Sequence, residues 1–76
     1  MIVSGVLFET IPGRAGAVAM RLAQIEGLEI TGSNGRERLA AVWRGPDGHT
    51  LEKQAEQLLK TESDILGIYP TFIGQD

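Results

Sequence analysis

The spacing of apolar residues changes along this 76-residue chain in a way that permits few folds. In four short segments apolar residues alternate with polar ones or run together, as they do in β-strands. In two other segments they recur every three or four residues, as on one face of an α-helix. Glycine, proline or asparagine stands at most of the junctions, where turns are expected. The pattern predicts six elements in the order strand, helix, strand, strand, helix, strand.

The expected bounds follow from the same pattern and from the residues that end each segment. We predict strands over residues 2–9, 28–33, 37–44 and 65–73, and helices over residues 13–26 and 49–62. Gly27 is expected as the left-handed C-cap of the first helix, and Asp47 as the N-cap of the second. Asn34-Gly35 predicts a tight hairpin. Because Pro70 has no N–H to donate, it predicts an edge strand or a bulge.

Two βαβ units joined by a hairpin give the ferredoxin-like βαββαβ fold of the α+β class. We expect one such domain over residues 1–76, with a four-stranded antiparallel sheet. Each helix has an apolar stripe, so both helices should pack on the same face of the sheet. Nothing in the chain is then left to cover the other face. That uncovered face must be solvated, paired with a second copy, or used to bind a partner.

Side chains alternate between the two faces of a strand, so the sequence also predicts which residues are uncovered. In the strand over residues 37–44, one set contains Arg38 and Arg44, and we assign this charged set to the uncovered face. The other set contains Trp43 and should face the helices. In the last strand, Phe72 is expected in the core. The uncovered face would then have a shallow apolar floor with small residues among larger ones: Val3, Gly5, Leu7, Ala40, Val42, Tyr69, Thr71 and Ile73.

Composition argues for a binding module rather than an enzyme. The chain has no cysteine and one histidine, so it has no thiol nucleophile and no second histidine or cysteine for a metal site. We expect no metal and no cofactor. Seven Lys+Arg against ten Asp+Glu give a net charge of −3, the wrong sign for a nucleic-acid binder. No apolar run is long enough to cross a membrane, and the first residues do not have the pattern of a secretory signal. We therefore expect a cytoplasmic protein without a membrane partner.

Five segments resemble the NapD family of small chaperones. They are residues 3–8 (Val-Ser-Gly-Val-Leu-Phe), 25–30 (Ile-Glu-Gly-Leu-Glu-Ile), 38–43 (Arg-Leu-Ala-Ala-Val-Trp), 47–51 (Asp-Gly-His-Thr-Leu) and 65–72 (Ile-Leu-Gly-Ile-Tyr-Pro-Thr-Phe). Together they span nearly the whole chain, and the resemblance lies in the apolar pattern and the glycines. The chain departs from the family pattern at Ser63-Asp64, before the last strand, and at Pro70 within it.

The resemblance implies a cytoplasmic chaperone of a molybdenum-containing periplasmic nitrate reductase. Such a protein binds the twin-arginine signal peptide of the catalytic subunit and delays export until the cofactor is inserted. The peptide would lie on the uncovered face, and its arginines would seek Glu9, Glu37 or Asp64, away from the arginines of the hairpin. The expected peptide-binding residues are Gly5, Leu7, Glu9, Ala40, Val42, Tyr69, Thr71 and Ile73.

A second resemblance keeps another function open. The ligand-binding and dimerisation domain of Lrp/AsnC regulators shares the Pro-Gly before its first helix, here Pro12-Gly13, although its acidic signature is missing after Asn34. That resemblance implies a small-molecule sensor that dimerises through its sheet, with the ligand between chains. Oligomeric state separates the two functions, although a chaperone of this fold could also form a homodimer through the uncovered face.

Overall fold

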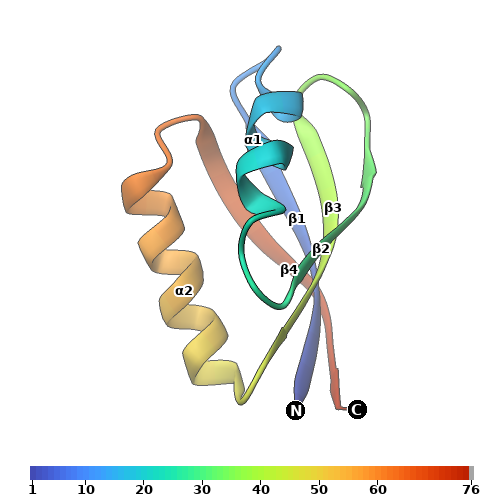
Figure 1. The fold of residues 1–76 in the computed structure, drawn as a ribbon, viewed down its shortest axis with the longest axis vertical. Helices are drawn as coiled ribbons and strands as arrows, with labels where there is room; N and C mark the ends of the chain where they lie inside the picture. Colours follow the sequence, from blue (N-terminus) through green and yellow to red (C-terminus); the bar gives the residue numbers. More distant parts are fainter. Residues whose placement is uncertain (76) are drawn as a thin grey trace.

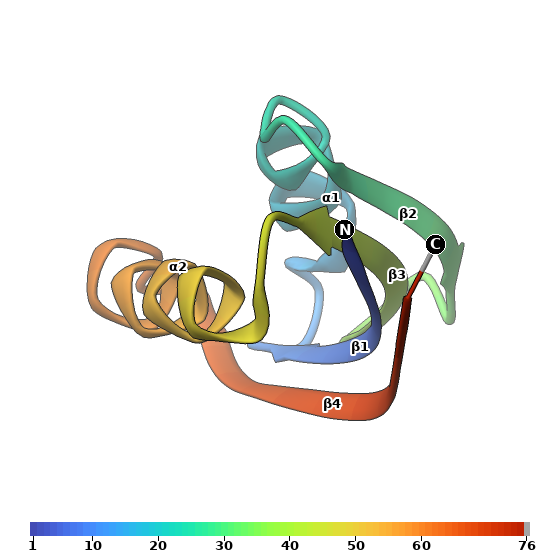
Figure 2. The ribbon, with the colours of Figure 1, turned by 90° about the horizontal axis from the view of Figure 1, so that it is seen from below.

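The computed structural model describes residues 1–75 and confirms the predicted order of elements. Their bounds are β1 Ile2–Thr10, α1 Ala15–Leu22, β2 Leu28–Ser33, β3 Arg38–Gly45, α2 Gly48–Thr61 and β4 Ile65–Gln75. The strands form one antiparallel sheet in the order β2-β3-β1-β4. Both helices lie on the same side of this twisted sheet (Figures 1 and 2). This is the ferredoxin-like fold expected from the sequence. No helix within residues 1–75 is long and apolar enough to span a membrane.

The first helix is shorter than the sequence predicts, at both ends. Gly13 has a positive φ of 88°, and its N–H donates to the carbonyl of Arg36, so the residues before Ala15 are held as a turn. After Leu22 the chain continues in tighter turns. Gly27 has the expected positive φ of 86°, but its carbonyl accepts from the N–H of Arg44 at 2.7 Å. Contact with β3 therefore ends the helix before its predicted cap.

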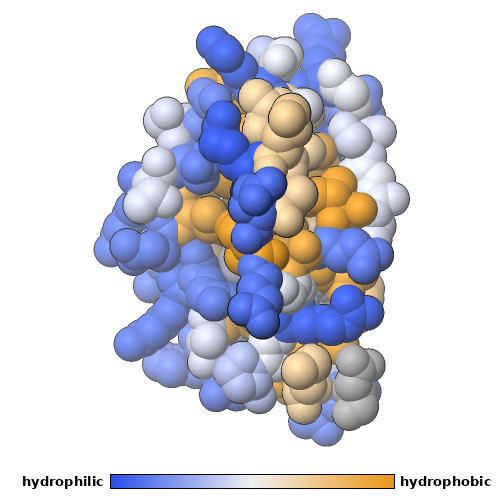
Figure 3. All heavy atoms as spheres, in the orientation of Figure 1, coloured by the Kyte–Doolittle hydropathy of each residue, from blue (hydrophilic) through white to orange (hydrophobic). Residues whose placement is uncertain are grey.

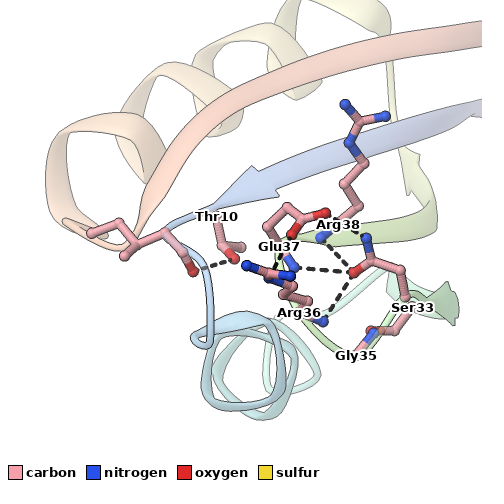
Figure 4. A network of polar contacts seen from close by, with 8 residues as sticks. Thr10, Ser33, Gly35, Arg36, Glu37 and Arg38 are labelled. Carbon is pink, nitrogen blue, oxygen red and sulfur yellow. Dashed lines mark hydrogen bonds and ion pairs between the residues drawn. The ribbon is translucent and has the colours of Figure 1, made fainter.

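The hairpin turn is wider than Asn34-Gly35 predicts, because four residues separate β2 from β3. The side-chain oxygen of Asn34 accepts from the backbone N–H groups of Arg36, Glu37 and Arg38, at 2.9, 3.0 and 3.0 Å (Figure 4). An asparagine that accepts from the following backbone stabilises a turn of this kind. Gly35 supplies the positive φ, 74°, that the turn requires.

The core lies between the helices and the sheet and confirms the faces predicted for β1 and β3. Its two largest aromatic side chains, Phe8 and Trp43, are fully buried, with ring centroids 6.2 Å apart and planes tilted by 41°. The tilted arrangement is favourable for an aromatic pair. The buried core consists of Val6, Phe8, Ala15, Val18, Leu22, Leu28, Leu39, Ala41, Trp43, Leu51 and Ile65.

Two neighbouring residues of β1 test this assignment of faces. Replacing buried Phe8 by alanine should lower the free energy of unfolding by about 3–5 kcal/mol, because it removes a fully buried ring. Replacing Leu7, which lies on the other face, should cost only about 1 kcal/mol. Urea titrations of the two variants measure the difference. Equal losses would contradict the division of β1 into a core face and an open face.

The start of α2 has the predicted N-cap. The Oδ1 atom of Asp47 accepts from the N–H of Thr50 at 2.7 Å, and this hydrogen bond holds the pKa of the Asp47 carboxyl below its usual range. A carboxyl group whose pKa is lowered by folding stabilises the folded protein fully when the pH is above the pKa of that group in the unfolded chain. This stabilisation is lost as the pH falls through the pKa of the group in the folded protein.

We therefore expect Asp47→Ala to lower the thermal midpoint at neutral pH. Asp47→Asn should lower it less, because asparagine also caps helices. The difference between wild type and Asp47→Asn should be full above about pH 5 and should shrink at lower pH as the aspartate is protonated. Thermal unfolding followed by circular dichroism from pH 2 to 7 measures this. A pH-independent difference would show that the charge of Asp47 does not contribute.

Candidate functional site: the open face of the sheet

The sheet surface opposite the helices is called the open face below. Strand register determines its members, because residues directly opposite each other in neighbouring strands point to the same side. Leu7 lies between Ala40 and Tyr69, and Gly5 lies between Val42 and Phe72. The open face is formed by Glu29 and Gly32 of β2, Arg38, Ala40, Val42 and Arg44 of β3, Val3, Gly5, Leu7 and Glu9 of β1, and Gly67, Tyr69, Thr71 and Phe72 of β4.

Large apolar and aromatic side chains on this face are exposed to solvent. Leu7 is 39% exposed, Tyr69 52% and Phe72 56%, and the three occupy adjacent positions on β1 and β4. Single exposed apolar residues are ordinary on a protein surface, but a contiguous group of them marks a candidate interaction site.

A β-bulge in β4 changes which residues reach the open face. Pro70 pairs with Val6 and Phe72 pairs with Gly5, so Thr71 is an extra residue between them. One extra residue reverses the alternation of faces along the rest of the strand. The assignment of Phe72 to the core is therefore wrong, because Phe72 lies on the open face. The assignment of Ile73 to the open face is also wrong: Ile73 lies opposite Ser4, on the face that carries the helices, and is 68% exposed there.

Two glycines on the open face are covered by aromatic rings from β4. A side chain at Gly5 would overlap the Phe72 ring and the Thr71 hydroxyl, and one at Gly67 would overlap Tyr69. On the other face, the buried hydroxyl of Ser4 donates to the carbonyl of Phe72 at 3.2 Å and thereby ties β1 to the bulge. The floor is therefore built of aromatic rings that pack against glycines.

A shallow depression of about 310 Å³ lies next to these rings. It is lined by two apolar residues of β1, an acidic and a basic residue, and the aromatic ring of Tyr69: Leu7, Phe8, Glu9, Arg38 and Tyr69. Glu9 is half-buried and lies directly opposite Arg38 in the register of β1 and β3. The depression thus combines an apolar floor with one charge of each sign.

The other two carboxylates that we expected to receive peptide arginines have partners elsewhere. Asp64 accepts from the guanidinium of Arg21 at 3.2 Å, and Glu62 accepts from the same guanidinium at 2.7 Å; these bonds raise the pKa of Arg21. Glu37 accepts from the side-chain amide of Asn34 at 2.8 Å, within the hairpin turn. Among the three expected acceptors, Glu9 is the one on the open face.

Sequence analysis missed the contributions of Phe72, Gly67 and Glu29 to this surface. Glu29 reaches it because it lies opposite Val42 at the start of β2. For Phe72, the available signal was Pro70: a proline that interrupts a strand indicates a bulge, and a bulge reverses the faces beyond it. Of the eight residues expected to bind a peptide, the structure brings together Gly5, Leu7, Glu9, Ala40, Val42, Tyr69 and Thr71.

A second depression, of about 200 Å³, lies on the helix side between the end of α1 and α2. Figure 3 shows apolar surface in this region, surrounded by hydrophilic side chains. Its floor includes Trp43, and the residues that line it are uncharged: Ile25, Trp43, Gln54, Gln57, Leu58 and Thr61. Within residues 1–75, no group of three or more histidine, cysteine or acidic side chains is placed to hold a metal ion. The open face therefore offers the richer chemistry for a partner.

No family model matches the chain, and no curated protein matches it. Among solved structures, the solution structure of the E. coli Tat proofreading chaperone protein NapD matches with a TM-score of 0.79. The match covers 97% of this chain and 78% of that chain, at 20% sequence identity. The chain has the fold of NapD.

The similarity to NapD confirms, at the level of fold, the resemblance that the sequence suggested. It extends over β1 to β4 and both helices, because almost the whole chain is covered. At 20% identity the match shows that the two backbones are similar, but it does not show that the side chains of the open face are similar. Whatever function this chain performs on its sheet therefore has to be argued from those side chains.

The packing of Phe72 on Gly5 makes a local prediction. Gly5→Ala should displace the exposed Phe72 ring while the fold is retained, because the ring can rotate into solvent. Proton shifts of the Phe72 ring should change clearly. Gly32→Ala, on the same face, is the control, since the nearest side-chain atom is at ordinary contact distance there, 3.8 Å. Unchanged Phe72 shifts in Gly5→Ala would contradict the proposed packing.

Proposed function

We propose that this chain is a chaperone that binds the twin-arginine signal peptide of a molybdenum-containing periplasmic nitrate reductase precursor in the cytoplasm. Binding delays export until the cofactor has been inserted. The observation that carries the proposal is the open face, on the fold of a Tat proofreading chaperone. It is a contiguous apolar floor, and at its edge lies the carboxylate of Glu9, which no ion pair engages within residues 1–75.

The chemistry of the peptide matches that of the open face. A signal peptide is cationic at one end and apolar beyond it, so as an amphipathic segment it presents both an apolar stripe and positive charge. Leu7, Tyr69 and Phe72 supply exposed apolar and aromatic area. Glu9 supplies a carboxylate next to that area. The chain's net charge of −3 also favours the approach of a cationic partner.

The sheet edges favour binding on the face over the addition of a strand. At the β4 edge, Pro70 has no N–H to donate, and the bulge at Thr71 interrupts the regular register. At the β2 edge, the register shifts between Ile30 and Gly32. Bulges and prolines at edges oppose pairing with another strand. A partner therefore finds its largest regular surface on the open face.

A peptide titration tests the proposal. The protein is labelled with nitrogen-15 and titrated with a synthetic twin-arginine signal peptide of the same organism's periplasmic nitrate reductase, and with a twin-lysine version. Amide shifts should concentrate on residues 5–9, 38–42 and 67–72. They should be weaker with the twin-lysine peptide, because lysine lacks the planar fork of arginine.

Two leucines of similar exposure provide matched variants. Leu7→Asp on the open face should weaken binding by at least about tenfold, because a charge then replaces part of the apolar floor. Leu59→Asp on α2, where the leucine is 45% exposed, should leave the affinity unchanged. Absence of binding together with the tumbling time of a dimer would contradict the proposal and favour a sensor domain that dimerises through its sheet.

A further inference from the structure

We propose that the depression beside Glu9 is a subsite for a single guanidinium group of the bound peptide. In this inference Glu9 accepts hydrogen bonds from the guanidinium, Tyr69 stacks against its plane, and Arg38 competes with it for Glu9. The inference rests on the proposed function, because the guanidinium belongs to an arginine of the signal peptide. Beyond the proposed function, it identifies Glu9 and Tyr69 as the residues that recognise that arginine and Arg38 as the residue that opposes its binding.

The carboxylate of Glu9 is placed to accept hydrogen bonds from a bound ligand. It is half-buried, it lines the depression, and no hydrogen bond or ion pair engages its carboxylate within residues 1–75. Partial burial strengthens an ion pair relative to one in bulk water. By contrast, Asp64 is held by Arg21, and Glu37 is held by Asn34. An arginine brought to the open face near the depression therefore meets Glu9 first.

Tyr69 forms the aromatic wall of the subsite. Its hydroxyl end lies over Gly67, which is the residue directly opposite Glu9 in β4. The ring therefore extends from the row of Leu7 toward the row of Glu9, and Tyr69 and Glu9 both line the depression. A guanidinium is planar and weakly hydrated, so it can stack on a ring while its N–H groups face a carboxylate. Leu7 beneath it can pack against the aliphatic part of the arginine.

The positive charge of Arg38 opposes binding of a peptide arginine at Glu9. Its backbone N–H donates to Asn34, whereas its side chain extends away from the turn, and no contact is drawn at its guanidinium (Figure 4). Its position opposite Glu9 lets the long side chain approach the same carboxylate. A bound peptide arginine must therefore approach Glu9 next to the positive charge of Arg38. Arg38 therefore lowers affinity for arginine peptides and keeps the depression neutral when it is empty.

A double-mutant cycle tests the subsite. The synthetic signal peptide is prepared with each arginine in turn changed to glutamine, and its affinity is measured by calorimetry for wild type and Glu9→Gln. One of the two arginine changes should weaken binding to wild type by about tenfold but binding to Glu9→Gln by less than about twofold. Glu29→Gln is the matched control: it removes a carboxylate from the same face, and both arginine changes should retain their full effect.

The flanking residues give further readouts. Arg38→Gln should tighten binding of the unmodified peptide about three- to fivefold, since a competing positive charge is removed. Tyr69→Leu should weaken binding and reduce the preference for arginine over lysine at the coupled position, whereas Tyr69→Phe should retain the preference. If the peptide binds wild type but neither arginine couples to Glu9, the subsite is wrong and the proposed function stands. If the peptide does not bind wild type at all, both are overturned.

Discussion

The structure depends on burial of both helices on the same side of one small sheet. Helix α1 contributes Ala15, Val18 and Leu22 to a core built around Phe8 and Trp43, and α2 adds Leu51. Two helices are enough to cover one face of four strands, and this is where the chain gains most of its burial. The opposite face has to remain at the surface. Its exposed rings are therefore a consequence of the architecture as well as a candidate site.

The bulge at Thr71 determines what that surface offers. Without the extra residue, Phe72 would lie on the helix side, opposite Ser4, where Ile73 lies now. With it, Phe72 packs on Gly5 and enlarges the apolar floor beside Leu7 and Tyr69. Pro70 and the Ser4 hydrogen bond both belong to this local arrangement. A bulge next to a binding surface commonly serves to redirect a side chain in this way.

Ion pairs and hydrogen bonds hold three of the acidic side chains within the fold. Arg21 holds Glu62 and Asp64 and thereby links α1 to the turn before β4. The carboxylate of Glu37 accepts a hydrogen bond from the side-chain amide of Asn34 within the hairpin turn. These three carboxylates lie near the ends of the strands, whereas Glu9 and Glu29 lie on the open face. An overall charge of −3 conveys little of this, because the position and the pairing of each carboxylate decide what it can bind.

The sequence by itself determined the order of elements, the one-sided packing of the helices and the faces of β1 and β3. These features follow from local periodicity, which is visible in any window of several residues. It also placed Asp47 at a helix start and most of the floor residues on the open face. The wide hairpin was decided by hydrogen bonds that Asn34 makes within its own turn. The short first helix and the faces of Phe72 and Ile73 were decided by tertiary structure. Each depends on a partner distant in sequence: Arg44 for Gly27, Arg36 for Gly13, and Gly5 and Ser4 for the bulge in β4. Side chains alternate between the two faces of a strand only while its register is regular. One inserted residue therefore reverses the predicted face of every residue after it.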